Sequence, residues 1–268
     1  NRSMAQNSEI KNLIFEGAGI RGIAYAGVID ELEKSNVIQG VERVGGTSAG
    51  AITALILSLG YSSANMKSII YNTNFKQFND GKLSVAGGLH RMKKNYGWYL
   101  GKKFEKWLSK LIEARTGNAD CTFMDLHSKG YKDLFVTATC LNKQKVIVFS
   151  YLTYPNMKVK DAVRISMSIP LYFKAVWIDQ EGRVLRKSED TQNADLVIDG
   201  GMKANFPITL FDTMTVISSS EQIRTANIHT LGIRIDSDTQ IKLDKSGNEL
   251  ETFEINSLGD YLRASYVF

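Results

Sequence analysis

Cysteine, histidine and proline are scarce in this 268-residue chain, which contains two, three and three of them. No apolar run is long enough to span a bilayer, and the N-terminus lacks the charged-then-apolar pattern of a secretory leader. Cys121 and Cys140 lie in neither a Cys-x-x-Cys pair nor a metal-binding cluster, so we expect reduced, buried thiols. The sequence therefore predicts no disulfide framework, no zinc site and no membrane span.

What the chain does contain is typical of a globular protein with a substantial core. Apolar residues make up 43% of it, and its length suits one large α/β domain or two small ones. We expect residues 1–10 to be a tail or an expression remnant and residues 11–268 to be a single domain, whose apolar ending is consistent with truncation at the C-terminus. The formal charge of +5 suits an anionic membrane or an acidic ligand, and equally an ordinary soluble protein.

The stretch Gly46-Thr47-Ser48-Ala49-Gly50 follows a short apolar run and precedes a strongly helical segment. Gly-x-Ser-x-Gly between a strand and a helix is the pattern of a nucleophile elbow, which turns sharply and holds the serine at its tip. The helix should be buried nearly all round, since apolar residues occupy most of its circumference. Its positive dipole end would favour negative charge on an attacked carbonyl. Taken alone, the motif also fits a plain strand-to-helix turn.

A second glycine-rich turn, residues 17–22, follows an apolar strand at 12–15 and precedes an amphipathic helix that should end at Asn36. The backbone N–H groups of such a turn converge and can hold an anion or an oxyanion. The Gly-x-Gly-x-x-Gly spacing also fits a dinucleotide-binding loop, which makes an NAD(P)-binding oxidoreductase an alternative. That alternative needs an acid closing the second strand, and Glu42 fits poorly because the chain turns directly into the next glycine loop.

A β-rich apolar run at 196–198 ends in Asp199-Gly200-Gly201. Open α/β sheets place their chemistry at the carboxyl ends of strands, and the two glycines would let another loop approach the carboxylate. A solvated Asp-Gly turn is the alternative for this motif by itself.

Serine hydrolases usually pair the nucleophile with a histidine, but His90, His127 and His229 all lie outside glycine-rich contexts. A triad that uses His229 stays open in chain order. A dyad is favoured, in which Asp199 takes the Ser48 proton directly. It requires hydrogen-bonding reach and an aspartate whose pKa is raised by burial or otherwise matched to the task.

The remaining pattern predicts several elements. These are an irregular stretch at 61–95 with a loop at Gly87-Gly88, a helix at 100–115, a strand pair at 134–138 and 146–149, helices at 159–167 and after 205–207, and a last strand at 231–235. One face of the 100–115 helix carries four lysines, which indicates either a solvated surface or a face that meets anionic lipid.

Together these motifs resemble the patatin-like phospholipase family. Residues 15–22 look like its oxyanion loop, 46–50 like its nucleophile elbow and 199–201 like its catalytic Asp-Gly-Gly, and the weaker stretches 164–170 and 205–207 are similar to its Ser-x-x-x-Pro block and to the residues after Asp-Gly-Gly. The resemblance covers about residues 12–210 in order, whereas the dinucleotide reading explains the first motif alone.

One position departs from the family pattern. Ala18 occupies the middle of what is usually a run of three glycines. A methyl group there costs on the order of 1 kcal/mol if φ is positive and nothing if φ is negative. Ala18 is also the sole sequence support for a third reading, a catalytically silent membrane-binding module.

The resemblance implies a three-layer α/β/α patatin-like fold with a central, mostly parallel sheet. It also implies hydrolysis of lipid acyl esters, of the phospholipase A or lysophospholipase type, by a Ser-Asp dyad without metal or cofactor. The implied partners are a phospholipid or other acyl lipid and a peripheral membrane surface, with no nucleic acid. The implied place is the cytoplasm or a membrane surface, although some bacterial members are secreted effectors that need a host activator protein.

The site residues that follow from the resemblance fall into three groups. The catalytic pair is Ser48 and Asp199, and the supporting glycines are Gly46, Gly50, Gly200 and Gly201. The oxyanion-hole residues are Gly17, Ala18, Gly19, Ile20, Arg21, Gly22 and Ala49. Of these, Arg21 is expected to position the loop or a phosphate group, or to form a surface ion pair.

Overall fold

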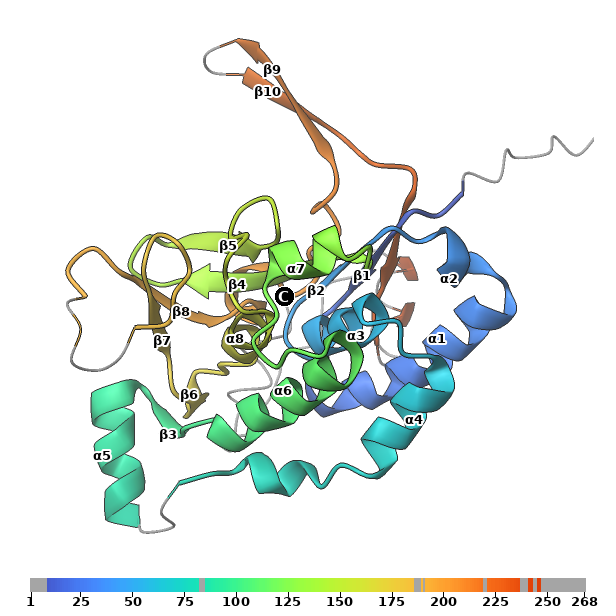
Figure 1. Ribbon diagram of the computed structural model, residues 1–268. Coiled ribbons are helices and arrows are strands. Elements are labelled where there is room, and N and C mark those ends of the chain that lie inside the picture. Colours follow the sequence, from blue (N-terminus) through green and yellow to red (C-terminus); the bar gives the residue numbers. More distant parts are fainter. Residues whose placement is uncertain are drawn as a thin grey trace, which may run out of the picture.

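The computed structural model describes residues 9–81, 85–185, 189, 191–218, 221–236, 241–242 and 245–246. A seven-stranded sheet lies at its centre in the order β11-β1-β2-β4-β8-β7, with β5 paired to β4 (Figure 1). The strands of this sheet are β1 (Asn12–Phe15), β2 (Arg43–Gly46), β4 (Asp133–Cys140), β5 (Lys145–Phe149), β7 (Val176–Ile178), β8 (Asp195–Asp199) and β11 (Thr230–Ile233).

Strand direction divides the sheet into two parts. β11, β1, β2 and β4 run parallel to one another, whereas β5 and β8 are antiparallel to β4. β7 is antiparallel to β8 and therefore runs with the first group. Five of these seven strands share one direction, so the predicted α/β fold with a mostly parallel central sheet is confirmed.

Helices flank the sheet, and α3 and α8 pack directly on its strands, with α6 beyond α8 (Figure 1). The helical segments are η1 (Gly19–Ala24), α1 (Tyr25–Lys34), α2 (Val37–Gly40), α3 (Ala49–Ser58), α4 (Ser63–Tyr71), η2 (Phe75–Phe78), α5 (Val85–Asn95), α6 (Lys102–Thr116), α7 (Phe123–Ser128), α8 (Val159–Ser166) and α9 (Gly201–Ala204), where η marks a 3-10 helix. Within the described residues, no helix is long and apolar enough to cross a membrane.

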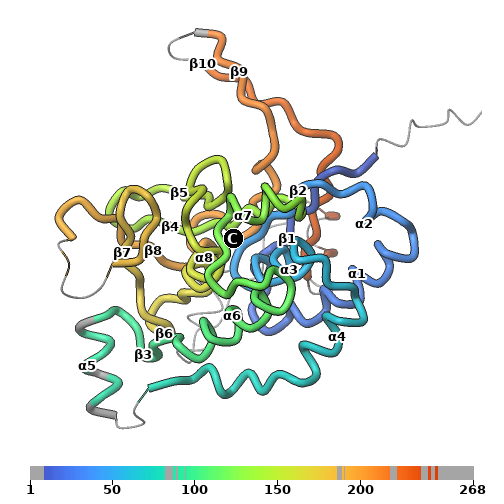
Figure 2. Tube along the Cα trace, in the orientation of Figure 1, coloured from blue at the N-terminus to red at the C-terminus, as the bar shows by residue number. Residues whose placement is uncertain are grey.

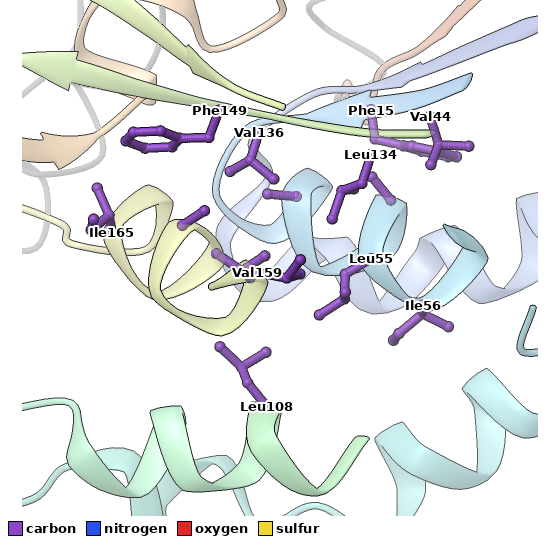
Figure 3. Close-up of a cluster of buried hydrophobic side chains, with 14 of the residues drawn as sticks. Phe15, Val44, Leu55, Ile56, Leu108, Leu134, Val136, Phe149, Val159 and Ile165 are labelled. Carbon is purple, nitrogen blue, oxygen red and sulfur yellow. The ribbon is translucent and has the colours of Figure 1, made fainter. Parts of the chain in front are cut away.

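The main core lies between the sheet and α3, α6 and α8. Alternation along β1 directs Leu13 and Phe15 into this core and Ile14 to the opposite face, where it packs with Phe135 and Phe211. Figure 3 shows the labelled side chains of β1, β2 and β4 directed toward α3 and α8. As predicted, α3 is buried nearly all round, since every residue except Ile52 is buried.

The expectation that 61–95 is irregular is wrong, because the stretch contains α4, η2 and α5. A capping box formed by Ser62 and Asn65 begins α4, so polar residues that suggested a loop start a helix instead. Gly87-Gly88 lies inside α5 rather than in a loop. A side chain on Gly88 would begin 2.3 Å from the Trp98 ring, so glycine is needed here for close packing against an aromatic side chain.

The expected helix after 205–207 is also wrong. The chain makes turns there and continues into β9 (Thr213–Ser218) and β10 (Glu221–Thr225), a hairpin that stands away from the body (Figure 2). The helices expected at 100–115 and 159–167, the strand pair that became β4 and β5, and the late strand that became β11 are confirmed within a few residues. Cys121 and Cys140 are free and buried, as expected. The small sheet of β3 (Gly97–Tyr99) and β6 (Leu171–Phe173) was not predicted.

Candidate active site

Ser48 directly precedes α3 and lies two residues after the end of β2. Its backbone has φ 54° and ψ −120°, a conformation that a residue with a side chain adopts at a cost, and the residue is 3% exposed. The flanking glycines make this turn feasible. A side chain on Gly46 would begin 2.5 Å from the backbone of Gly50, and one on Gly50 would begin 2.3 Å from the Phe15 carbonyl oxygen. The sequence between β2 and α3 therefore folds into the predicted sharp turn.

Replacing Gly50 by Ala is expected to lower the free energy of unfolding by about 3 kcal/mol or more, since the clash is with backbone that cannot repack. Gly27→Ala is the matched control. Gly27 lies in α1, has open space where a Cβ would be, and should gain about 0.5 to 1 kcal/mol from the substitution. Urea unfolding of both variants measures the difference, and equal stabilities would contradict this reading of the elbow.

The C-terminal end of α8 holds both halves of the candidate dyad. The Ser166 hydroxyl accepts a hydrogen bond of 2.8 Å from the Ser48 N–H, and the Ser168 carbonyl accepts one of 3.1 Å from the Asp199 N–H. Arg164, almost completely buried, donates to the Ser168 hydroxyl at 2.7 Å and to the Leu100 carbonyl at 2.9 Å. The sequence of this segment resembles a Ser-x-x-x-Pro block, and nothing in it indicates these contacts.

Asp199 ends β8 and is completely buried. Its Oδ1 accepts a 2.7 Å hydrogen bond from the Gly201 N–H, and no group in the described part of the chain donates to Oδ2 with normal geometry. Burial raises the pKa of this carboxyl to about 7, against the smaller lowering effects of the Gly201 N–H and the Ser48 hydroxyl. A carboxylate in this state is a capable proton acceptor near neutral pH.

The Ser48 hydroxyl lies within reach of two acceptors. Its Oγ donates to the Met167 sulfur at 3.3 Å, and the same hydroxyl lowers the pKa of Asp199 by hydrogen bonding. Because the hydroxyl hydrogen can rotate, one position of the Ser48 side chain allows either interaction. The contact with Met167 therefore does not prevent transfer of the Ser48 proton to Asp199.

β8 brings Asp199 to the elbow by a route that differs from the one expected. The sequence predicts an acid at the carboxyl ends of parallel strands, but β8 is antiparallel to β4. The pairing of β2 with β4 ends at Val136, but β4 continues to Cys140. Asp199 pairs with Ala138, which lies in this extension of β4. The extra length of β4 therefore carries a returning strand to the level of Ser48. A side chain on Gly200 would begin 2.7 Å from the Thr137 carbonyl oxygen, so glycine lets β8 end this close to β4.

The glycine-rich loop packs against the elbow, as its predicted role requires. A side chain on Gly22 would begin 2.8 Å from the Cβ of Ala49, and one on Gly17 would begin 3.4 Å from the Cβ of Ser48. Ala18 has φ −124°, so its methyl group causes no backbone strain, whereas Gly19 has the positive φ of 53° that favours glycine. The departure from three glycines is therefore tolerated at the position where it occurs.

Four of the predicted oxyanion-hole residues, Ala18, Gly19, Ile20 and Ala49, have backbone N–H groups without a hydrogen-bond partner among the described residues. Two other predicted members of the hole are placed differently. The Gly17 N–H donates to the Asn205 carbonyl at 2.9 Å, and the Arg21 N–H donates to the Ala18 carbonyl at 3.1 Å. These two N–H groups are therefore occupied in holding the loop.

The side chains of Ile20 and Arg21 are both exposed, and Ile20 also lines the apolar cavity described below. Ile20 is 68% exposed, and Arg21 is exposed and forms no ion pair with any residue of the described chain. Burial raises the pKa of Glu16, and the charge of Arg234 and, to a smaller extent, that of Arg21 oppose this rise. Arg21 therefore lies free at the loop's surface, where a ligand could reach it.

Asn205 adds a polar group that was singled out only as part of a weak resemblance. Its Nδ2 donates to Glu16 at 3.2 Å, and its Oδ1 is buried, without a donor in the described chain. A side chain on Gly17 would begin 2.3 Å from this oxygen. Asn205 thus packs the start of the glycine loop against the segment that follows Asp199.

His229 and His127 lie away from Ser48. The His229 backbone carbonyl accepts a hydrogen bond from the Asn12 N–H at the amino end of β1, which is the end of the strand away from the elbow, and the His229 Nδ1 contacts the Glu9 carbonyl. His127 stacks on Tyr151 and pairs with Asp133. A Ser-His-Asp triad through His229 is therefore excluded. In the described residues no group of three or more His, Cys, Asp and Glu could hold a metal ion.

An apolar cavity of about 260 Å³ opens beside the elbow. Its lining begins with Gly19, Ala49 and Met167, the residue whose sulfur contacts the Ser48 hydroxyl, and continues over α3, α4, η2 and α6. The site thus joins a buried acid, a strained serine, unpaired N–H groups and a space for an apolar ligand.

Comparison with known proteins agrees with this geometry. A family model described as patatin-like phospholipase matches residues 13–212. The chain belongs to this family. The patatin-like domain is 33% identical over 208 residues to the uncharacterized protein YqhO of Bacillus subtilis, covering 74% of this chain and 65% of that protein. It is 25% identical over 201 residues to the probable lipid hydrolase 463L of invertebrate iridescent virus 6, covering 75% of this chain and 62% of that protein.

Among solved structures, VipD from Legionella pneumophila superposes on this patatin-like domain with a TM-score of 0.55 at 18% identity, covering 89% of this chain and 52% of VipD. That likeness supports the fold. The chain spans just under two thirds of the length of the two relatives described above. Glu42, the acid that a dinucleotide site would need at the end of β2, lies before the start of β2 and is paired with Lys11.

Proposed function

We propose that this chain hydrolyses fatty-acyl esters of lipids by means of a dyad formed by Ser48 and Asp199. The observation that carries the proposal is the position of a fully buried aspartate, whose pKa is raised to about 7, beside a serine held in a strained elbow. Membership of the patatin-like phospholipase family and similarity to a viral protein named a probable lipid hydrolase support lipid ester hydrolysis as the reaction.

In the acylation step Asp199 accepts the Ser48 proton while Oγ attacks the ester carbonyl carbon. The negative charge that develops on the carbonyl oxygen is stabilised by the unpaired N–H groups of Ala18, Gly19 and Ala49 and by the N-terminal end of α3. Asp199 then donates the proton to the leaving alcohol, and the C–O bond to that alcohol breaks. The fatty-acyl group is left esterified to Ser48.

In the deacylation step the same carboxylate accepts a proton from water, whose oxygen attacks the acyl carbon. The bond to Ser48 Oγ breaks, Oγ takes the proton back, and the fatty acid leaves. Two structural features prepare the site for both steps. The Ser166 hydroxyl fixes the Ser48 backbone, and the Gly201 N–H fixes the orientation of the Asp199 carboxylate.

The substrate class follows from the surroundings of the dyad. An apolar cavity beside the nucleophile suits an acyl chain, and the exposed lysines of α6 provide a cationic surface for an anionic membrane. We therefore propose an acyl lipid as substrate and a peripheral membrane surface as its location, with activation by a partner protein as an additional requirement to test.

Labelling with a fluorophosphonate probe tests the dyad directly. We expect the probe to modify Ser48, identified by mass spectrometry, and to leave Asp199→Asn unlabelled because no base remains to activate the hydroxyl. Ser58→Ala is the matched control, since Ser58 is another buried serine of α3, bonded to the Lys132 carbonyl and remote from the glycine loop. It should label like the unmodified chain. A folded protein that remains unlabelled at Ser48, both alone and with anionic vesicles, would overturn the proposal.

A further inference from the structure

Three consecutive residues, at and just after the end of α8, contact the candidate dyad. The Ser166 hydroxyl accepts from the Ser48 N–H at 2.8 Å, and the Met167 sulfur accepts from the Ser48 hydroxyl at 3.3 Å. The Ser168 carbonyl accepts from the Asp199 N–H at 3.1 Å. We call residues 166–168 the dyad-holding segment. Because this segment contacts both members of the dyad, its position sets the separation between the nucleophile and the base.

Arg164 fastens the dyad-holding segment to a part of the chain that is distant in sequence. Its Nη1 donates to the Ser168 hydroxyl at 2.7 Å, and that hydroxyl donates back to the Arg164 carbonyl at 3.2 Å. Its Nη2 donates to the Leu100 carbonyl at 2.9 Å. The planar guanidinium therefore joins the segment to the residue that lies two positions before α6.

The Leu100 end of this link is itself held in place. The Asp80 carboxylate accepts from the N–H groups of Gly101 and Lys103, at 2.7 and 3.1 Å, and so caps the first turn of α6. Gly101 has a φ of 73°, and a side chain there would begin 2.1 Å from the Arg164 Nε. Glycine therefore suits this backbone conformation and leaves the space that the guanidinium occupies.

The charge of Arg164 is not explained by an ion pair. Arg164 is 4% exposed and lies over the Phe173 ring at 4.9 Å, and it forms no ion pair with any residue of the described chain. Burial lowers its pKa to about 10 against the opposing charges of Glu105, Asp80 and Asp161, so the guanidinium stays protonated at neutral pH. Burying a charge without a paired counter-ion is costly, and apolar side chains of similar volume are often more stabilising. Stability alone therefore does not account for an arginine here.

We propose that Arg164 is a positioning residue for the reaction, whose guanidinium fixes the dyad-holding segment and thereby the distance over which the Ser48 proton passes to Asp199. The inference rests on the proposed function, since this distance matters only if the two residues react. Arg164 hydrogen-bonds to neither of them and acts through the Ser168 hydroxyl. A displacement of about 1 Å in a catalytic group can cost about a hundredfold in rate, so loss of the link should be visible in kcat.

Arg164→Ala is expected to lower kcat for a short ester about a hundredfold and to leave KM within about twofold, because the dyad is misaligned while the substrate contacts remain. The rate of fluorophosphonate labelling at Ser48 should fall by the same factor. Arg43→Ala is the matched control. Arg43 also lies over a ring, that of Phe211, at 4.8 Å and donates to Asn12 Oδ1 at 2.7 Å, but it begins β2, at the end away from the elbow. This variant should lose stability in urea unfolding and keep its kcat.

Chemical rescue separates positioning from stability. Arg164→Ala leaves a space bounded by the Ser168 hydroxyl, the Leu100 carbonyl and the Phe173 ring, which a free guanidinium ion can enter. Guanidinium chloride at about 50 mM, far below the molar concentrations that unfold proteins, should raise the kcat of this variant about tenfold. Sodium chloride at the same concentration should not, and guanidinium should leave the kcat of Arg43→Ala unchanged.

Arg164→Lys carries the test if the alanine variant does not fold. Lysine keeps the positive charge, but its compact ammonium group lacks the planar fork that reaches both the Ser168 hydroxyl and the Leu100 carbonyl. We expect kcat to fall about tenfold with KM unchanged, since the charge is present and the alignment is not.

The outcomes separate this inference from the function beneath it. A lower kcat with unchanged KM, restored by guanidinium in Arg164→Ala but not altered in Arg43→Ala, supports the positioning role. The role is overturned if a folded Arg164 variant keeps the kcat of the unmodified chain, if the loss appears in KM instead, if Arg43→Ala loses as much kcat, or if guanidinium restores nothing to folded Arg164→Ala. In each of these cases the dyad stands, because the unmodified chain is labelled at Ser48. If that chain is neither labelled nor able to cleave an ester, the proposed function fails and this inference fails with it.

Discussion

Ser48→Ala is expected to abolish ester hydrolysis, with a loss of at least about four orders of magnitude in kcat, because no other group replaces the nucleophile and only binding and the N–H donors remain. The fold should be unaffected, since within the described residues the Ser48 hydroxyl interacts only with Met167 and Asp199, and the Ser48 backbone is held by the Ser166 hydroxyl. The measurement is turnover of a short ester together with circular dichroism. Activity within an order of magnitude of the unmodified chain would contradict the role of this serine.

Ser48→Gly distinguishes catalysis from strain at the same position. It removes the same hydroxyl, so hydrolysis should also be lost. Glycine, however, adopts the φ of 54° without the penalty paid by a residue with a Cβ. We therefore expect Ser48→Gly to be more stable than Ser48→Ala by about 1 kcal/mol in urea unfolding. A lower stability for the glycine variant would show that the elbow is not strained.

Asp199→Asn should likewise abolish turnover, by about four orders of magnitude, because an amide accepts no proton from Ser48 or from water. In the unmodified chain the base is active only when ionised. The rate of acylation should therefore rise with pH through about 7, the pKa to which burial raises Asp199. A rate that is independent of pH from about 5 to 9, or substantial turnover by the asparagine variant, would exclude Asp199 as the base.

The same substitution should change stability in a pH-dependent way. Because the folded-state pKa of Asp199 lies above its unfolded value of 3.8, its contribution to stability is fully present below the unfolded pKa and is lost as pH rises through about 7. Asparagine has no charge to bury. Relative to the unmodified chain, Asp199→Asn should gain on the order of 4 kcal/mol between about pH 4 and pH 8. Parallel denaturation curves at the two pH values measure this gain.

The parts of the site that sequence could predict are those whose chemistry is encoded locally. The elbow and the glycine loop each turn sharply within a few residues, and their glycines identify positions where backbone approaches backbone. The sequence could not show that Ser166 holds the Ser48 N–H, since the two lie 118 residues apart and a serine near a helix end has many uses. The contact between Met167 and Ser48 could not be predicted either, because a methionine that lines a cavity looks in the sequence like any core methionine.

The fold could be predicted where apolar periodicity was strong, as in α3 and α6. The prediction failed where the composition of a segment resembled that of a loop. Ser62 and Asn65 are residue types common in loops, but here they form the reciprocal cap that begins α4. Glycine is unfavourable inside a helix, but Gly88 leaves the space that the Trp98 ring occupies. The direction of β8 lay beyond local sequence for another reason. Whether a strand pairs parallel or antiparallel depends on which neighbour it meets, and that neighbour, β4, lies more than fifty residues earlier in the chain.

β11 shows that the folding unit and the family-matched region have different limits. The match ends at residue 212, yet residues 230–233 return beside β1 and complete its row of backbone hydrogen bonds. A protein shortened to the matched region would leave β1 as a bare outer strand, with Leu13 and Phe15 next to unpaired N–H and C=O groups. Such an edge recruits strands from other molecules, so the shortened protein should form insoluble aggregates. The boundary for a stable, active fragment therefore lies beyond β11.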